Sequence, residues 1–388
     1  MDRIYSHYRI LALLTCPLEF LVFAIISSFP WLVVGLRQES LVSVQDFPSM
    51  STTCEFFHFG FCSRYFFNCS LPMTFRYLLT CLFLVAVSVL RHIDFLVQEA
   101  LDQGADVLVT SGAVQSNHCR LTASAAAREG MECYVILEER IPGSYNPKAG
   151  GNNYAFALLG AEQIHAPLGG VAPIQDDLVA QLKAEGKKPY VIPGGGSNEM
   201  GALGYCVAAA EIIDQSQALK EANGEEEKPG LFWDGIVTCS GSGGTHTGIL
   251  TGLRAADIDT PVIGISVRFD AETQGNRIRG QVEACIDKYF ADCDAFADGL
   301  GKDEVIILDS HVGEGYSLPT KEMANAIQNF ARLESIILDP VYTGKGAAGL
   351  LAVASDGSYR QNQRILFIHT GGAPSLYHYQ TLPSDLGE

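Results

Sequence analysis

The spacing of apolar residues changes abruptly near residue 90. Residues 10–36 and 77–90 are almost continuously apolar, with no helical or strand period between them. From Arg91 onwards apolar and polar positions alternate regularly. In RHIDFLVQEALDQGA the apolar residues Ile93, Leu96, Val97 and Ala100 fall on one helical face, which predicts an amphipathic helix ending near Gly104.

Short apolar segments and helical patterns then follow one another along the chain. Predicted strands are ADVLVTSG, ECYVILEE, PYVIPGG, WDGIVTCSG, TPVIGISV, EVIILD and ILFIHTGG. Predicted helices are NHCRLTASAAAREG, residues 174–185, LGYCVAAAEIIDQ and residues 320–333. In the first of these, Asn117 is a candidate N-cap and Gly130 a stop signal. This alternation predicts βαβ units and parallel sheets, an α/β protein with two open twisted sheets flanked by helices.

The segment before Arg91 has a different composition. Residues 1–90 contain no Lys but 12 of the 20 Phe. Glu19, Pro17 and Pro30 interrupt the longer apolar run, and a charge near mid-span costs roughly 2.5–3.5 kcal/mol on insertion scales. Two interpretations remain: a hydrophobic membrane anchor, or a segment that was never selected to fold with the rest, which the composition favours.

We therefore expect three parts: the atypical segment 1–90, a smaller α/β domain at 91–200, and a larger α/β domain at 201–388 that carries a phosphate-binding loop. The net charge of −18 argues against a nucleic-acid partner, because phosphate binding needs basic surface. We expect a cytoplasmic or organellar soluble protein, and membrane association only if the first segment is genuine.

The stretch CSGSGGTHTG follows a predicted strand and opens a predicted helix. Backbone N–H groups of glycines at a helix N-terminus favour a phosphate group. No Gly-Lys-Ser/Thr follows, so the loop is not of the Walker A type. The alternative is an ordinary strand-to-helix turn. The candidate phosphate ligands are Gly241, Ser242, Gly243, Gly244 and Thr245.

Three further motifs lie where predicted strands or turns lead into helices. Ser116 and Asn117 in SGAVQSNHCR would face a cleft at the carboxyl edge of a sheet, or would simply cap a helix. Tyr342 in DPVYTGKG stands in a turn, where a buried packing role is the alternative. Thr370 closes the strand of FIHTGGAP, before two glycines that allow close backbone approach.

Together QSNHCR, SGSGGTHTG, LDPVYTGK and HTGGAP resemble the pyridoxal-phosphate enzymes that comprise D-cysteine desulfhydrase and 1-aminocyclopropane-1-carboxylate (ACC) deaminase. The resemblance covers about residues 91–380. It implies the fold of the tryptophan synthase β-like enzymes, pyridoxal 5'-phosphate as cofactor, a small amino-acid substrate such as D-cysteine, and a homodimer. It implies no metal ion.

The resemblance also implies residue roles. Asn117 would bond the ring hydroxyl of the cofactor, and Ser116 would meet the substrate carboxylate or assist proton movement. Tyr316 and Tyr342 would lie near substrate and cofactor. Thr343 would face the pyridine nitrogen, at a position where the resemblance implies Glu in ACC deaminases. Thr370 stands where those enzymes carry Leu, so Thr343 and Thr370 both favour D-cysteine desulfhydrase.

One residue of the family pattern is missing. Before the first helix the family reads approximately GGNKxRKLEFL, and its lysine bonds covalently to the cofactor. RHIDFL aligns with RKLEFL, which places Val89 at the lysine position and Ser88 at the preceding Asn. The first lysine of the chain is Lys148, and we expect both Lys148 and Lys345 to be structural or surface residues.

Three functional hypotheses follow from this departure. The first is a D-cysteine desulfhydrase-like protein that is impaired without the lysine. The second is an ACC deaminase, and the third is an inactive protein that retains the fold.

Overall fold

The computed structural model describes residues 87–356 and 363–379. They all belong to one compact unit, Leu71–Glu388. The apolar runs at 10–36 and 77–86 lie outside the described residues. Within the described ranges, no helix combines the length and apolar composition needed to cross a membrane.

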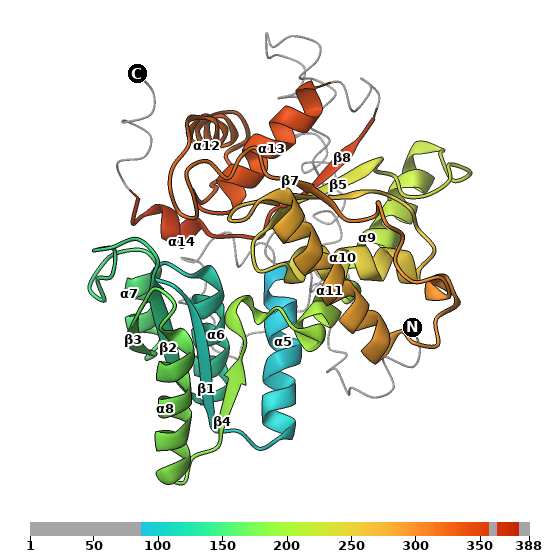
Figure 1. Cartoon of the computed structure of the whole chain (residues 1–388). Coiled ribbons are helices and arrows are strands. Elements are labelled where there is room, and N and C mark those ends of the chain that lie inside the picture. Colours follow the sequence, from blue (N-terminus) through green and yellow to red (C-terminus); the bar gives the residue numbers. More distant parts are fainter. Residues whose placement is uncertain (1–86, 357–362, 380–388) are drawn as a thin grey trace, which may run out of the picture. The chain divides into compact units, whose positions relative to one another are not determined.

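The described chain contains two parallel four-stranded sheets, which lie in the lower and upper parts of Figure 1. The first has the strand order β3-β2-β1-β4 and the second the order β7-β6-β5-β8. The first comprises β1 (Val107–Ala113), β2 (Glu132–Glu139), β3 (Glu162–Pro167) and β4 (Pro189–Ile192). The second comprises β5 (Gly235–Ser240), β6 (Val262–Ser266), β7 (Ile306–Leu308) and β8 (Ile365–Ile368). This confirms the predicted α/β class with two open sheets flanked by helices.

Helices connect the strands, as parallel pairing requires. Those of the first half are α5 (Val87–Asp102), α6 (Asn117–Glu129), α7 (Asn152–Leu158), α8 (Val171–Ala184) and α9 (Glu199–Asn223). Those of the second half are α10 (Gly244–Ala255), α11 (Ala271–Tyr289), α12 (Lys321–Glu334), α13 (Thr343–Ser355) and α14 (Ala373–Leu376). The predicted domain boundary at residue 200 lies at the start of α9, between the two sheets, and stays a prediction.

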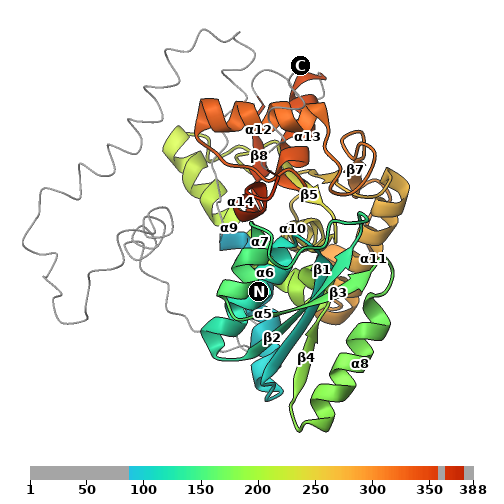
Figure 2. The ribbon, with the colours of Figure 1, turned by 90° about the vertical axis from the view of Figure 1, so that its left-hand side faces the viewer.

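The helix predicted from the stripe at the start of the body is α5. Ile93, Leu96, Val97 and Ala100 are all buried, because α5 packs against α6 and α9. The long helix α9 also packs along α10, so it contacts one helix next to each sheet, α5 and α10 (Figure 2). The helical period of apolar residues therefore correctly predicted which face of α5 is buried.

One cap prediction was wrong. The N-cap of α6 is Ser116, whose extended backbone (φ −65°, ψ 121°) precedes the first helical residue, Asn117. Gly130 is the C-cap in the left-handed conformation, as predicted. Ser and Asn are almost equally good N-caps, so residue type alone could not separate two neighbours.

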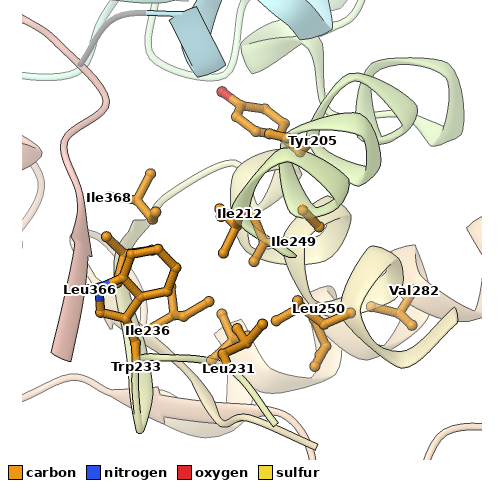
Figure 3. Close-up of a cluster of buried hydrophobic side chains, with 14 of the residues drawn as sticks. Tyr205, Ile212, Leu231, Trp233, Ile236, Ile249, Leu250, Val282, Leu366 and Ile368 are labelled. Carbon is orange, nitrogen blue, oxygen red and sulfur yellow. The ribbon is translucent and has the colours of Figure 1, made fainter. Parts of the chain in front are cut away.

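The main apolar core of the second sheet lies between the sheet and helices α9, α10 and α11. Figure 3 shows Trp233, Ile236, Leu366 and Ile368 facing Ile249 and other helical side chains. Burying each such aliphatic side chain contributes roughly 1.5–3 kcal/mol. This packing fixes β5 and α10, and therefore the glycine loop that joins them.

Candidate active site

The glycine loop runs from the end of β5 into the first turn of α10. Gly243 is the N-cap, at φ 105°, a backbone conformation that side chains rarely allow. It has no side chain to cap α10, so backbone N–H groups of the first turn are available to an anion. The Gly244 N–H donates to the Ser197 hydroxyl at 3.2 Å.

Ser197 is a part of this loop's surroundings that the sequence did not single out. It follows the short 3-10 helix η2 (Gly194–Gly196), and its hydroxyl also lies 2.7 Å from the Ser242 hydroxyl. The Gln281 amide from α11 donates to the Ser242 carbonyl at 3.0 Å. These contacts hold the loop in place from two sides.

Thr245 lies at the start of α10, beside Tyr205 of α9. In Figure 3 the Tyr205 ring stands at one end of the apolar cluster and its hydroxyl points away from it. Burial raises the pKa of Tyr205 to about 12, partly offset by its hydrogen bond with Thr245. Tyr205 also stacks on His92 of α5, with ring centroids 5.4 Å apart. The phenol therefore stays neutral and anchors the loop helix.

The second predicted motif lies at the carboxyl end of β1. The Ser116 hydroxyl oxygen accepts the Cys119 N–H at 3.1 Å, so Ser116 is a cap, and its hydroxyl hydrogen remains a donor. The Asn117 amide oxygen accepts from the Asn152 side chain at 2.8 Å. Asn152 is itself fixed by Gln115. Asn117 is therefore oriented, with its amide nitrogen as the remaining donor.

Tyr316 and Tyr342 meet directly. Their hydroxyl oxygens are 2.7 Å apart and their rings pack edge to face, at 77°. Burial raises the pKa of both phenols. The Tyr342 ring also contacts the glycine loop, because a Cβ added to Gly241 would lie 2.8 Å from its Cε1 atom. A side chain at Gly241 would thus displace Tyr342.

Lys345 binds the loop that leads to Tyr316. Its ammonium donates to the carbonyls of Val312 and Gly315, at 2.6 and 2.9 Å, in the loop that leads to Tyr316. Its side chain is fully buried, and burial lowers its pKa to about 8. Lys148, in contrast, is exposed. Lys345 is thus a structural lysine.

Thr343 begins α13 and is fully buried. Its hydroxyl donates to the Asp339 carboxylate at 2.9 Å and accepts the Asp339 N–H at 2.8 Å. Asp339 also accepts the N–H groups of Val341, Tyr342 and Thr343. The hydroxyl hydrogen of Thr343 has two acceptors nearby, the Asp339 carboxylate and, at 3.4 Å, the Gly371 carbonyl, so the hydroxyl can only accept from any further group. Thr343, the residue predicted to face the pyridine nitrogen, is thus hydrogen-bonded to the carboxylate of Asp339.

Thr370 lies at the end of β8, partly exposed. Burial raises the pKa of the neighbouring Cys239 thiol, and hydrogen bonding to Thr370 partly offsets this rise. Thr370 therefore stands at the carboxyl edge of the second sheet, beside the strand that leads into the glycine loop.

A cavity of about 50 Å³ joins the two edges. Gln115 from the loop after β1 lines it, together with Tyr316, Val341 and Tyr379 from the second half of the chain. Of the predicted site residues, Tyr316 is the one in this lining, and Gln115 is the chain neighbour of Ser116. In the described part of the chain, no cluster of His, Cys, Asp and Glu is placed to hold a metal ion.

The predicted lysine position, Val89, falls in the first turn of α5. Its side chain, and Ser88, lie outside the described side chains. The expectation that the covalent lysine is missing therefore rests on the sequence alone.

The glycine loop and the oriented Asn117 both follow the carboxyl ends of parallel strands, where open α/β sheets bind their ligands. The family model for pyridoxal-phosphate dependent enzymes matches residues 86–371. The chain belongs to this family, and its family is pyridoxal-phosphate dependent, as the sequence predicted.

Two kinds of relative support this assignment. D-cysteine desulfhydrase of Serratia proteamaculans is 38% identical over 299 residues, covering 75% of this chain and 83% of the relative. The enzyme of Yersinia enterocolitica is 39% identical over 297 residues, covering 75% and 83%. A crystal structure of an ACC deaminase homologue has a TM-score of 0.66 and 30% identity, covering 78% of this chain and 84% of that one.

Proposed function

We propose that the chain is a D-cysteine desulfhydrase-like protein. The reaction is D-cysteine plus water to pyruvate, hydrogen sulfide and ammonia, by β-elimination. The relatives in Serratia and Yersinia that carry this name support it. The carrying observation is the cavity where Gln115 faces Tyr316, whose hydroxyl is bonded to that of Tyr342.

Bound pyridoxal phosphate supplies an electron sink for the bond broken at the substrate's Cα. The residues fit its phosphate, because no side chain caps α10 and backbone N–H groups of its first turn beyond Gly244 are left for the phosphate oxygens. Asn117 presents an amide donor to the ring oxygen. Thr343 and Thr370 are the candidate partners of the ring nitrogen and ring plane.

The remaining residues act on the substrate. Ser116 keeps its hydroxyl hydrogen as a donor for the carboxylate. In the Tyr316–Tyr342 pair one hydroxyl donates to the other, so the acceptor's own hydrogen is free to pass to the departing sulfide. The raised pKa values of these phenols keep both protonated at neutral pH.

Val89 limits this proposal to binding and slow chemistry. Without a lysine at that position the cofactor is held by non-covalent contacts only, and the amine that moves the Cα proton is absent. The likeness to an ACC deaminase homologue keeps deamination of ACC as a second candidate. An inactive, cofactor-binding protein is the third.

A repaired variant separates the three. We expect Ser88→Asn with Val89→Lys to release sulfide and pyruvate from D-cysteine at least tenfold faster than the unaltered chain, and to act poorly on ACC. Tyr342→Phe in the repaired background is the matched control and should lose most of the gain. Faster release of ammonia from ACC than of sulfide from D-cysteine would establish the deaminase instead. Cofactor binding without turnover of either substrate would establish the inactive protein.

Thr370 tests specificity within the same background. Thr370→Leu removes a hydroxyl from the pocket and should lower the rate with D-cysteine relative to ACC. A tenfold change corresponds to about 1.4 kcal/mol of barrier. We also propose two domains, 91–200 and 201–388. We further propose a homodimer, and light scattering of the purified chain tests this oligomeric state directly.

A further inference from the structure

A partly buried arginine lines the cavity, outside the residues assigned so far. Arg140 follows β2, and only 20% of its side chain is exposed. Its guanidinium carbon lies 4.6 Å from the centre of the Tyr316 ring. Its Nε donates to the Glu138 carboxylate at 2.5 Å. The arginine is therefore fixed against one of the two site tyrosines.

The carboxylate beside Arg140 is already engaged on both oxygens. One accepts from Arg140 and the other accepts the Gly169 N–H at 3.0 Å. Within the described chain, the two terminal nitrogens of Arg140 have no hydrogen-bond partner of their own. They are the charged donors left over at this end of the cavity.

Two hydroxyl groups in the cavity wall can also donate. The Ser144 hydroxyl is buried and, among the described residues, has no hydrogen-bond partner. Burial raises the pKa of Tyr379 to about 12, so its phenol is neutral and can donate. A buried hydroxyl without a partner, as at Ser144, costs free energy, which an incoming acceptor would recover.

The charge of Arg140 and the size of the cavity restrict the chemical class of the acceptor further. Although burial opposes it, Tyr316 and Glu138 raise the pKa of Arg140, so the guanidinium stays charged. A water needs about 10–15 Å³ measured in this way, so the cavity of about 50 Å³ holds about four water-sized groups. A carboxylate fits that space, and an aromatic side chain does not.

We propose that this cavity receives a negatively charged terminal group on the side chain of the amino-acid substrate, with Arg140 as its ligand. Arg140 is thus a specificity-determining residue, and its planar fork matches a carboxylate. The inference rests on the proposed function only in that the site binds an amino acid. It extends the substrate class to amino acids with a second anionic group at the β-carbon or γ-carbon.

The test uses the full chain without added cofactor and two ligands of the same shape, D-aspartate and D-asparagine. Isothermal titration calorimetry at low salt should show D-aspartate binding at least tenfold more tightly. Arg140→Gln should abolish the difference. Glu138→Gln should widen it several-fold, because the competing carboxylate is gone. Arg128→Gln, whose side chain is 64% exposed on α6, is the matched control and should change nothing.

The two site variants are expected to move the affinity ratio in opposite directions, which general destabilisation does not do. Equal binding of both ligands by the unaltered chain overturns the inference and leaves the amino-acid site intact. Binding of neither ligand also overturns the inference, whereas the proposed function is overturned only if the repaired variant releases no sulfide from D-cysteine. If Arg140→Gln fails to fold, an unchanged ratio in Glu138→Gln is sufficient to overturn it.

Discussion

The carboxylate of Asp339 is the polar group on which the start of α13 depends. It is fully buried and accepts four hydrogen bonds, two on each oxygen. In Asp339→Asn an NH2 group replaces one oxygen. If the oxygen bonded to Thr343 is lost, the Thr343 hydroxyl can turn and accept, but the Thr343 N–H has no acceptor left. Either orientation of the amide leaves at least one buried N–H facing a donor.

The cost of this change can be estimated from the bonds lost. A hydrogen bond to a charged group contributes about 1.5–3 kcal/mol, and an unsatisfied buried group costs about 1–3 kcal/mol. We therefore expect Asp339→Asn to lower the free energy of unfolding by about 3 kcal/mol. At about 2–4 °C for each kcal/mol, the melting temperature should fall by about 6–12 °C.

Urea unfolding followed by far-UV circular dichroism measures this loss. Asp177→Asn, at an exposed position of α8, is the control and should stay within about 0.5 kcal/mol. Thr343→Val removes the partner hydroxyl, and the double variant should lose less than the sum of the single variants because the two groups share bonds. An Asp339→Asn protein as stable as the control would refute the conclusion that this carboxylate holds the start of α13.

Three further predictions follow from the same contacts. Borohydride reduction in the presence of pyridoxal phosphate should fix no stoichiometric cofactor on a lysine, and a mass-mapped adduct on Lys148 or Lys345 would contradict the argument from Val89. Burial, and next the charge of His92, lower the pKa of His118 to about 3. Its contribution to stability is therefore present above pH 6.5 and is lost as the pH falls towards 3. In His118→Gln the free energy of unfolding should fall less steeply over this pH range. Burial lowers the pKa of Lys345 from 10.5 to about 8. Between these pH values the unfolded chain binds more protons than the folded chain, so the stability that depends on Lys345 rises with pH. The unfolding free energy of the unaltered chain minus that of Lys345→Met should therefore grow between pH 8 and 10.5, and a constant difference would show that the ammonium is not desolvated.

The sequence alone determined the features that depend on local spacing. The stripe Ile93, Leu96, Val97 and Ala100 predicted α5 and its buried face, because a helical period reports which side is apolar. The glycine loop after β5 was also recognisable from the sequence, because few residues other than glycine adopt the left-handed backbone conformation of Gly243. The motif order also led to the family, which the comparisons confirmed.

Tertiary structure decided the features that depend on residues far apart in the chain. Nothing near Arg140 in the sequence indicates that it lies over Tyr316, and nothing near Lys345 indicates that it binds the loop before Tyr316. Asp339 carried a weak signal, an Asp-Pro pair shortly before a helix, but its bonds to Thr343 required the folded turn. Spacing along a chain fixes which face of an element is apolar. Which side chains meet across two sheets is set by the packing of elements that the sequence does not place side by side.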